Sequence, residues 1–186
     1  MKFNPDIHHR RSIRLKNYDY SQAGAYFVTV CAQSRECLFG EIADGVMVMN
    51  DAGEMIEQWW MKLPDKFSTV ENDAYVVMPN HFHGIIVLAG AGPRACPDSG
   101  RTHGCAPTLG DVMIWFKTMT TNQYIRGVKE SHWPPFQGKL WQRNYYEHII
   151  RNEEELNKIR EYIINNPARW VEDEENPACR SKEAFA

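Results

Sequence analysis

Two histidines separated by a single phenylalanine have the types and spacing best suited to chemistry in this chain. His81 and His83 flank Phe82 and precede the apolar, β-branched run 84–88. Residues two apart in a β-strand point to the same face, so both imidazoles would project side by side while Phe82 entered the core. Such a pair can bind one divalent cation. The same spacing also fits two polar residues on a solvated strand face, and spacing alone does not separate these alternatives.

A second candidate site lies in a predicted helix near the C-terminal end. Asn152 can cap its first turn, the glutamates at 153–155 suit the positive end of the helix dipole, and Pro167 ends it. Tyr162 and Asn166 are four residues apart, so a hydroxyl and an amide oxygen can face the same target. Alternatively, Tyr162 is a half-buried core aromatic and Asn166 a helix C-cap, which the following proline biases away from helical geometry. The predicted apolar stripe of this helix consists of Leu156, Ile159 and Ile163.

Six short motifs follow one another along roughly residues 10 to 172 of the chain. They are YDYS (18–21), GAYFVTV (24–30), LFGEI (38–42), VVMPNHFHG (76–84), LWQRNYYEHIIR (140–151) and IREYIINNP (159–167). In this order they resemble the single-tyrosine transposases of the HUH class, and most of all the REP-associated tyrosine transposases. Each motif is weak by itself, but the ordered set is specific and favours the metal interpretation of the histidine pair.

The resemblance implies cleavage and rejoining of single-stranded DNA at hairpin-forming repeats. It makes Tyr162 the nucleophile, which would form a 5′-phosphotyrosine and release a 3′-hydroxyl. It also implies that His81, His83 and Asn166 hold a divalent cation. Mixed imidazole and amide ligands on a phosphate-bound cation suit Mg2+ or Mn2+, whereas zinc prefers a closed tetrahedral set. The sequence identifies no general base for Tyr162.

The segment before the tyrosine helix supplies rival nucleophiles and candidate DNA contacts. Tyr145 and Tyr146 are two further tyrosines, which we interpret as core or DNA-stacking residues. His148 is interpreted as a packing or hydrogen-bonding histidine rather than another ligand. The residues predicted to contact DNA are Trp141, Arg143 and Tyr145 in this segment and Arg10, Arg11, Arg14 and Lys16 near the N-terminus.

The charge distribution reconciles DNA binding with an acidic chain. The formal net charge is -3 and the pI is near 6.2, whereas many DNA-binding proteins are strongly basic. The acidic residues cluster at 153–155 and 172–175, so the basic cluster at 10–16 can still act as a DNA-docking arm. The alternative for this cluster is a solvated terminus, and the resemblance favours the arm.

Length and composition predict one globular domain. The chain has 186 residues, of which 43% are hydrophobic, which is ample for a single core. No apolar run has membrane-spanning length and the N-terminus lacks a signal-peptide pattern, so we expect a cytoplasmic protein without membrane contact. The five cysteines are odd in number and lack metal-site spacing, which predicts reduced thiols. We divide the chain into a basic arm (1–17), a domain (18–172) with a mobile loop at about 90–107, and an acidic, disordered tail (173–186).

The order of predicted elements indicates an α+β fold. Strands are expected at 25–32, 74–78 and 82–89, with a hairpin at 41–49 around Asp44-Gly45 and an edge strand near Leu140. Asn50 and Thr108 would cap two long helices, the second with Asp111 in a partial capping box. We therefore predict an antiparallel sheet with long helices on one face, a ferredoxin-like or RRM-like sandwich, and the tyrosine helix on the other face.

Two other functions remain open. The fold could serve as a module that binds repeat DNA without cutting it, or as a metal-dependent phosphoester hydrolase without a covalent step. The hydrolase hypothesis predicts that His81 and His83 are essential and that Tyr162 is dispensable. The sequence leaves both a monomer and a homodimer possible.

Overall fold

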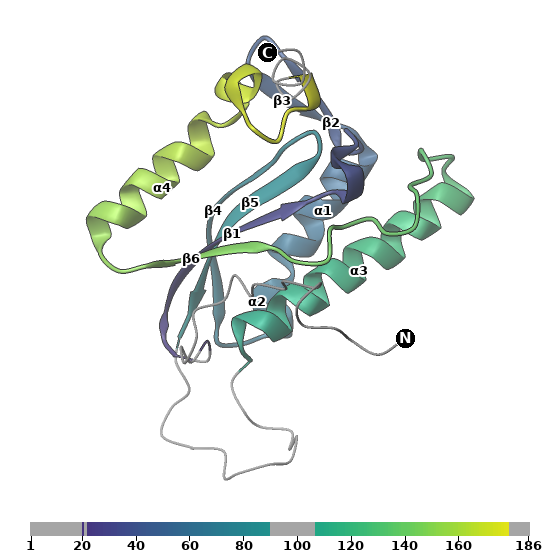
Figure 1. The fold of residues 1–186 in the computed structure, drawn as a ribbon. Helices are drawn as coiled ribbons and strands as arrows, with labels where there is room; N and C mark the ends of the chain where they lie inside the picture. The colour runs from purple at the N-terminus through teal and green to yellow at the C-terminus, as the bar shows by residue number, and fades with distance from the viewer. Residues whose placement is uncertain (1–19, 21, 90–106, 179–186) are drawn as a thin grey trace, which may run out of the picture.

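The computed structural model describes residues 20, 22–89 and 107–178. A four-stranded sheet in the order β4-β5-β1-β6 forms its centre, and all neighbouring strands are antiparallel (Figure 1). The strands are β1 (Gly24–Cys31), β4 (Val70–Val77), β5 (His81–Leu88) and β6 (Tyr146–Ile150). This order and the helices between the strands confirm the predicted α+β, ferredoxin-like architecture.

Two long helices cover one face of the sheet. They are α1 (Asp51–Met61) and α3 (Leu109–Glu130), with the short α2 (Leu63–Lys66) following α1. Both predicted caps are confirmed: Asn50 accepts hydrogen bonds from two backbone N–H groups of α1, and Thr108 forms a full capping box with Asp111. The main core fills the layer between these helices and the sheet, where Trp60 packs against Phe82.

A two-stranded hairpin extends from the main sheet. It joins β2 (Gly40–Ala43) to β3 (Val46–Met49), as the sequence predicts. Asp44 and Gly45 both have positive φ angles, 51° and 75°, which is the backbone of the type I′ turn that favours an Asp-Gly pair.

The helix carrying Tyr162, α4 (Glu153–Asn165), lies on the opposite face of the sheet, as predicted (Figure 1). Asn152 caps it by accepting from the backbone N–H of Glu155. Its buried residue Ile163 joins a second apolar cluster with Phe27 and Ile85 of the sheet. A 3-10 helix, η2 (Pro167–Glu172), follows directly, and a short 3-10 turn, η1 (Gln33–Arg35), follows β1.

The structure differs from the prediction in three details. The edge strand is β6 rather than a strand near Leu140, where Trp141 makes only a single bridge to Ala32. Asn166 is the C-cap of α4, as one alternative predicted, but its angles are helical (φ -58°, ψ -44°) because the chain continues into η2. Residues 173–178 are not a separate disordered tail: hydrogen bonds from Arg35 and Asn80 to the carbonyls of residues 174 and 175 hold this segment against the domain.

The remaining boundary predictions lie largely outside the described residues. These are the arm at 1–17, positions 90–106 of the predicted loop, and residues 179–186 of the predicted tail. Within the described part of the chain, no helix combines the length and apolar character needed to cross a lipid bilayer.

Candidate functional site

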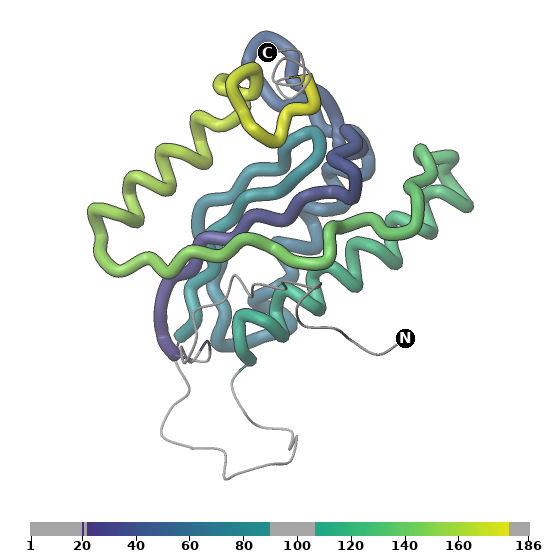
Figure 2. Tube along the Cα trace, viewed as in Figure 1, coloured from purple at the N-terminus to yellow at the C-terminus, as the bar shows by residue number. Residues whose placement is uncertain are grey.

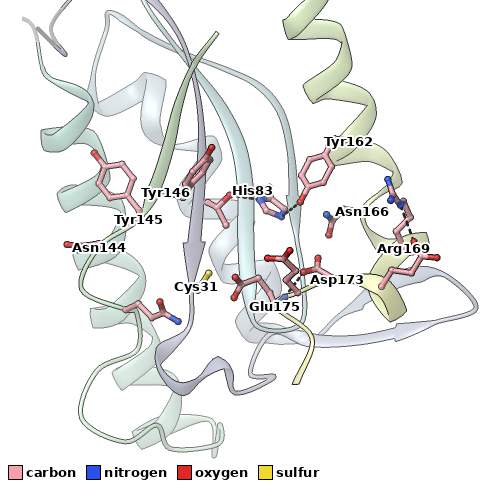
Figure 3. Close-up of a pocket in the computed structure, with 14 residues that line it drawn as sticks. Cys31, His83, Asn144, Tyr145, Tyr146, Tyr162, Asn166, Arg169, Asp173 and Glu175 are labelled. Atoms are coloured by element: carbon pink, nitrogen blue, oxygen red, sulfur yellow. Dashed lines mark hydrogen bonds and ion pairs between the residues drawn. The ribbon is translucent and has the colours of Figure 1, made fainter. Parts of the chain in front are cut away.

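A cavity of about 580 Å3 lies between α4, the sheet and the C-terminal segment. Figure 3 shows Tyr162 and Asn166 extending toward His83 from one side, with Asp173 and Glu175 below. The opposite wall comes from residues 142–146, which lead into β6. The cavity therefore combines side chains from segments more than 130 residues apart in the sequence, since β1 also contributes to it.

His83 lines this cavity, and its Nε2 lies 2.9 Å from the Nε2 of the buried His81. Both side chains are buried, and the intervening Phe82 points into the main core, so the predicted alternation along the strand is confirmed. In an octahedral site with ligand distances near 2.1 Å, adjacent ligands lie roughly 3 Å apart. The spacing of the two Nε2 atoms therefore suits two ligands of one cation.

Hydrogen bonds at the far side of each ring orient the histidines. Asn80 is buried and donates its Nδ2 to the carbonyls of Arg35 and Glu175, so its Oδ1 faces His81 Nδ1 at 2.9 Å. An amide oxygen only accepts, so His81 carries its proton on Nδ1 and turns the Nε2 lone pair toward the cavity. Thr29 Oγ1 lies 2.8 Å from His83 Nδ1 across the β1–β5 pairing and can accept in the same way.

Burial keeps both imidazoles neutral. It lowers the pKa of His83 to about 3 and the pKa of His81 well below its ordinary value, with the neighbouring His83 and Arg35 lowering the latter further. The neutral imidazole is the form that binds a metal ion. At neutral pH the pair therefore offers lone pairs rather than positive charges to the cavity.

Two oxygen atoms lie where they could complete a metal site. Asn166 Oδ1 is buried and has no hydrogen-bond partner, which is costly unless a ligand satisfies it. Asp173 Oδ2 lies 3.8 Å from His81 Nε2, and one ligand atom from each of His81, His83 and Asp173 lies within 4.8 Å of the others. Two nitrogens with amide and carboxylate oxygens form a suitable donor set for Mg2+ or Mn2+.

Sequence reasoning missed Asp173 and Asn80 as parts of this site. Asp173 lies beyond the proline that ends the helix, so no helical spacing relates it to Tyr162. Burial raises the pKa of Asp173, and the nearby Glu175 and Glu174 raise it further. Asn80 directly precedes His81, but only the fold reveals the two carbonyls that fix its amide.

Tyr162 reaches the histidine pair from α4. Its hydroxyl lies 3.5 Å from His83 Nε2, and its ring meets Phe27 edge-on at a centroid distance of 6.0 Å. The side chain is 43% exposed, so its hydroxyl is accessible from the cavity. Burial, and then the Asp173 carboxylate, raise the pKa of Tyr162, while a hydrogen bond with Asn166 lowers it. The predicted common face of Tyr162 and Asn166 is therefore confirmed.

The chain is similar to known proteins over most of its length. The chain is 42% identical over 180 residues to an "Uncharacterized protein" of Haemophilus influenzae, with 93% of this chain and 96% of that protein covered. It is 24% identical over 160 residues to that organism's "Putative REP-associated tyrosine transposase", covering 83% of this chain and 77% of the relative. The named relative makes this chain similar to the REP-associated tyrosine transposases.

One solved structure has a similar fold. The structure of a REP-associated tyrosine transposase bound to a REP hairpin matches with a TM-score of 0.54 at 21% identity, over 84% of this chain and 73% of that one. No family model matches the chain.

The wall opposite Tyr162 carries Tyr145 and Tyr146, the two rival tyrosines. Tyr146 is 54% exposed and meets Phe27 edge-on at 6.4 Å, so it is available for stacking. Tyr145 is partly buried and packs against the main core while also lining the cavity. Both tyrosines thus face the cavity from the wall across from α4.

Trp141 is a core residue, and the prediction that it stacks on DNA is wrong. Its side chain is buried against Phe39 and Phe116, and its Nε1 donates to Thr120 Oγ1 at 2.8 Å. A bulky indole next to two polar residues looks the same in sequence whether it faces DNA or the core. Arg143, in contrast, is exposed.

The remaining site predictions concern His148 and the basic residues near the N-terminus. His148 Nε2 lies 2.6 Å from Glu155 Oε1, so it is the hydrogen-bonding histidine that the sequence predicts. The predicted DNA contacts Arg10, Arg11, Arg14 and Lys16 lie outside the described residues.

Proposed function

We propose that this protein cleaves and rejoins single-stranded DNA beside hairpin-forming repeats, with Tyr162 as the nucleophile. The observation that carries the proposal is the 3.5 Å separation of the Tyr162 hydroxyl from His83 Nε2, beside two buried imidazoles whose Nε2 atoms converge. A nucleophile next to a metal-binding pair is the arrangement that phosphoryl transfer to tyrosine requires.

The chemistry conserves the number of phosphoester bonds. The Tyr162 oxygen forms a bond to phosphorus, and the bond from phosphorus to the 3′-oxygen breaks. The phenol loses its proton and the 3′-oxygen gains one. The product is a 5′-phosphotyrosine and a free 3′-hydroxyl. Because the covalent link keeps the phosphoester energy, another 3′-hydroxyl can reverse the step and rejoin the strand without ATP.

His81 and His83 would hold a divalent cation, Mg2+ or Mn2+, together with Asn166 as predicted and with Asp173 as a further carboxylate ligand. When bound, such a cation would polarise the scissile phosphate. This help matters because a neutral phenol is a poor nucleophile, and burial raises the pKa of Tyr162 further. Asn80 and Thr29 keep the Nε2 lone pairs of the two histidines directed at the site. The oxygen ligands can be distinguished by measuring Mn2+ affinity in Asn166→Ala and Asp173→Asn.

The proposed partner is a DNA hairpin with a single-stranded flank. A solved relative of similar fold is bound to a REP hairpin, and we extend that partner to this chain. Action on such repeats places the protein in the cytoplasm, and a monomer and a homodimer are both compatible with the cavity described.

A cleavage assay tests the proposal. The substrate is a labelled single-stranded hairpin taken from inverted repeats flanking the gene, incubated with Mn2+ or with EDTA. Wild type should form a DNA adduct that survives denaturing electrophoresis in Mn2+ alone, and Tyr162→Phe should form none. Tyr146→Phe is the matched control from the opposite cavity wall and should retain the adduct.

The other outcomes reassign the function. An adduct that persists in Tyr162→Phe but disappears in Tyr146→Phe or Tyr145→Phe moves the nucleophile to that residue. Metal-dependent cutting without any adduct supports the hydrolase. Tight hairpin binding without cutting supports the non-cleaving repeat-binding module.

A further inference from the structure

A second cavity, of about 420 Å3, lies between α3 and the segment that leads from this helix toward β6. The two run side by side in Figures 1 and 2. Its lining includes three cationic side chains, Lys117, Lys139 and Arg143, and no carboxylate. We call it the α3 groove. Hydroxyl and amide groups from Thr118, Thr121 and Asn122 add neutral hydrogen-bonding capacity along the same helix.

The α3 groove combines several positive charges and no carboxylate in its lining. In the described part of the chain, carboxylates pair with Arg35, Lys158, Arg160 and Arg169. Among the residues that the structure describes, no ion pair involves Lys117, Lys139 or Arg143. Three uncompensated positive charges around one hollow, in a chain of net charge -3, create a local positive potential that attracts an anionic partner.

Lys117 contributes hydrogen bonds to the backbone of the groove as well as a positive charge. Its Nζ donates to the carbonyls of Gln142 at 2.6 Å and Arg143 at 3.1 Å, which fixes the backbone that presents the Arg143 side chain. Burial, and then the neighbouring Lys139, lower the pKa of Lys117 to about 8. The lysine therefore remains mostly protonated at neutral pH, and the proximity of Lys139 shows how closely the positive charges are gathered.

The α3 groove and the cavity that contains Tyr162 meet at one shared residue. Gln142 lines both, and the residues after Arg143 form the wall with Tyr145 and Tyr146. A strand that leaves the Tyr162 cavity along this wall would therefore reach the groove next. The groove also exposes apolar surface from Ile125 and Phe136, and single-stranded sites combine a cationic track with apolar or aromatic surface for the bases.

We propose that the α3 groove binds the phosphates of the single-stranded DNA that continues from the cleavage site. This assignment rests on the proposed function for its substrate, and it adds Lys117 and Lys139 to the DNA contacts. The residues are suited to the backbone rather than to a base, because a lysine ammonium is a point charge without sequence preference.

Binding measurements with two probes test the groove. One probe is a labelled hairpin with a single-stranded flank of about 12 nucleotides, and the other is the same hairpin without the flank. The variants are Lys139→Gln and Arg143→Gln, whose side chains are exposed, and Lys66→Gln is the control with the same charge change on α2. Anisotropy is recorded over a series of salt concentrations.

We expect each groove variant to weaken binding of the flanked probe and to reduce the slope of log K against log salt by about 0.7. Lys66→Gln should match wild type, and the unflanked hairpin should bind all four proteins alike. The assignment fails if the groove variants match Lys66→Gln on the flanked probe, if they weaken both probes equally, or if wild type does not favour the flanked probe. Adduct formation by wild type is measured separately, so its absence would overturn the proposed function without altering the groove result.

Discussion

Asn80→Ala should disturb both the stability of the domain and its affinity for metal. The side chain is fully buried and makes three hydrogen bonds, to the carbonyls of Arg35 and Glu175 and to the ring of His81. At about 1 kcal/mol for each bond, the substitution should lower the free energy of unfolding by about 3 kcal/mol. It should also weaken metal binding by 10- to 100-fold, roughly the loss expected when a partner that orients a histidine ligand is removed.

Asn72→Ala provides a matched control on the same sheet. Its amide donates one hydrogen bond, to the Trp60 carbonyl, and its oxygen is buried without a partner, so its removal should cost about 1 kcal/mol or less. Urea denaturation in EDTA measures both free energies, and repeating it with Mn2+ measures the stabilisation that the metal provides. At saturating Mn2+ a 10- to 100-fold weaker affinity removes about 1.4 to 2.8 kcal/mol of that stabilisation. Equal losses in Asn80→Ala and Asn72→Ala, or unchanged stabilisation by Mn2+ in Asn80→Ala, would refute the reasoning.

Three further predictions follow from the site and its supports. Gly84→Ala should cost about 1 to 3 kcal/mol in urea denaturation, because its Cβ would lie 2.5 Å from Trp60; unchanged stability would contradict this packing. The pKa of His83 is about 3 in the folded state and 6.5 in the unfolded state, so in EDTA only the unfolded state gains this proton as the pH falls below 6.5. The free energy of unfolding should therefore be about 2 kcal/mol lower at pH 5 than at neutral pH. His83→Gln should abolish the part of this pH dependence that comes from His83. Asp73→Asn removes the carboxylate charge and one of the two oxygens that accept from Arg160, so amide hydrogens of α4 should exchange faster at pH 7. Because Arg160 lowers the pKa of Asp73, the difference from wild type should disappear only below pH 3.8. Equal exchange at pH 7 would show that the pair does not anchor the helix.

Local patterns in the sequence were enough to predict most of the elements and the centre of the site. Three of these features depend only on interactions within a few residues, so they can be predicted from the sequence alone. They are capping by Asn50, the Asp-Gly turn and the strand alternation of His81 and His83. The common face of Tyr162 and Asn166 follows from helix geometry in the same way. Each of these predictions concerns side chains whose relative positions the backbone period sets.

Tertiary structure alone decided which distant segments meet. Nothing in the spacing of residues brings Asp173 to His81, and the contact exists because Asn80 and Arg35 hold the C-terminal segment against the end of the sheet. Likewise, Trp141 and Arg143 are two residues apart, and only the packing of Trp141 against the core separates a structural indole from an exposed cation. Sequence period determines which side chains share a face, but the free energy of burial over the whole fold determines what that face contacts.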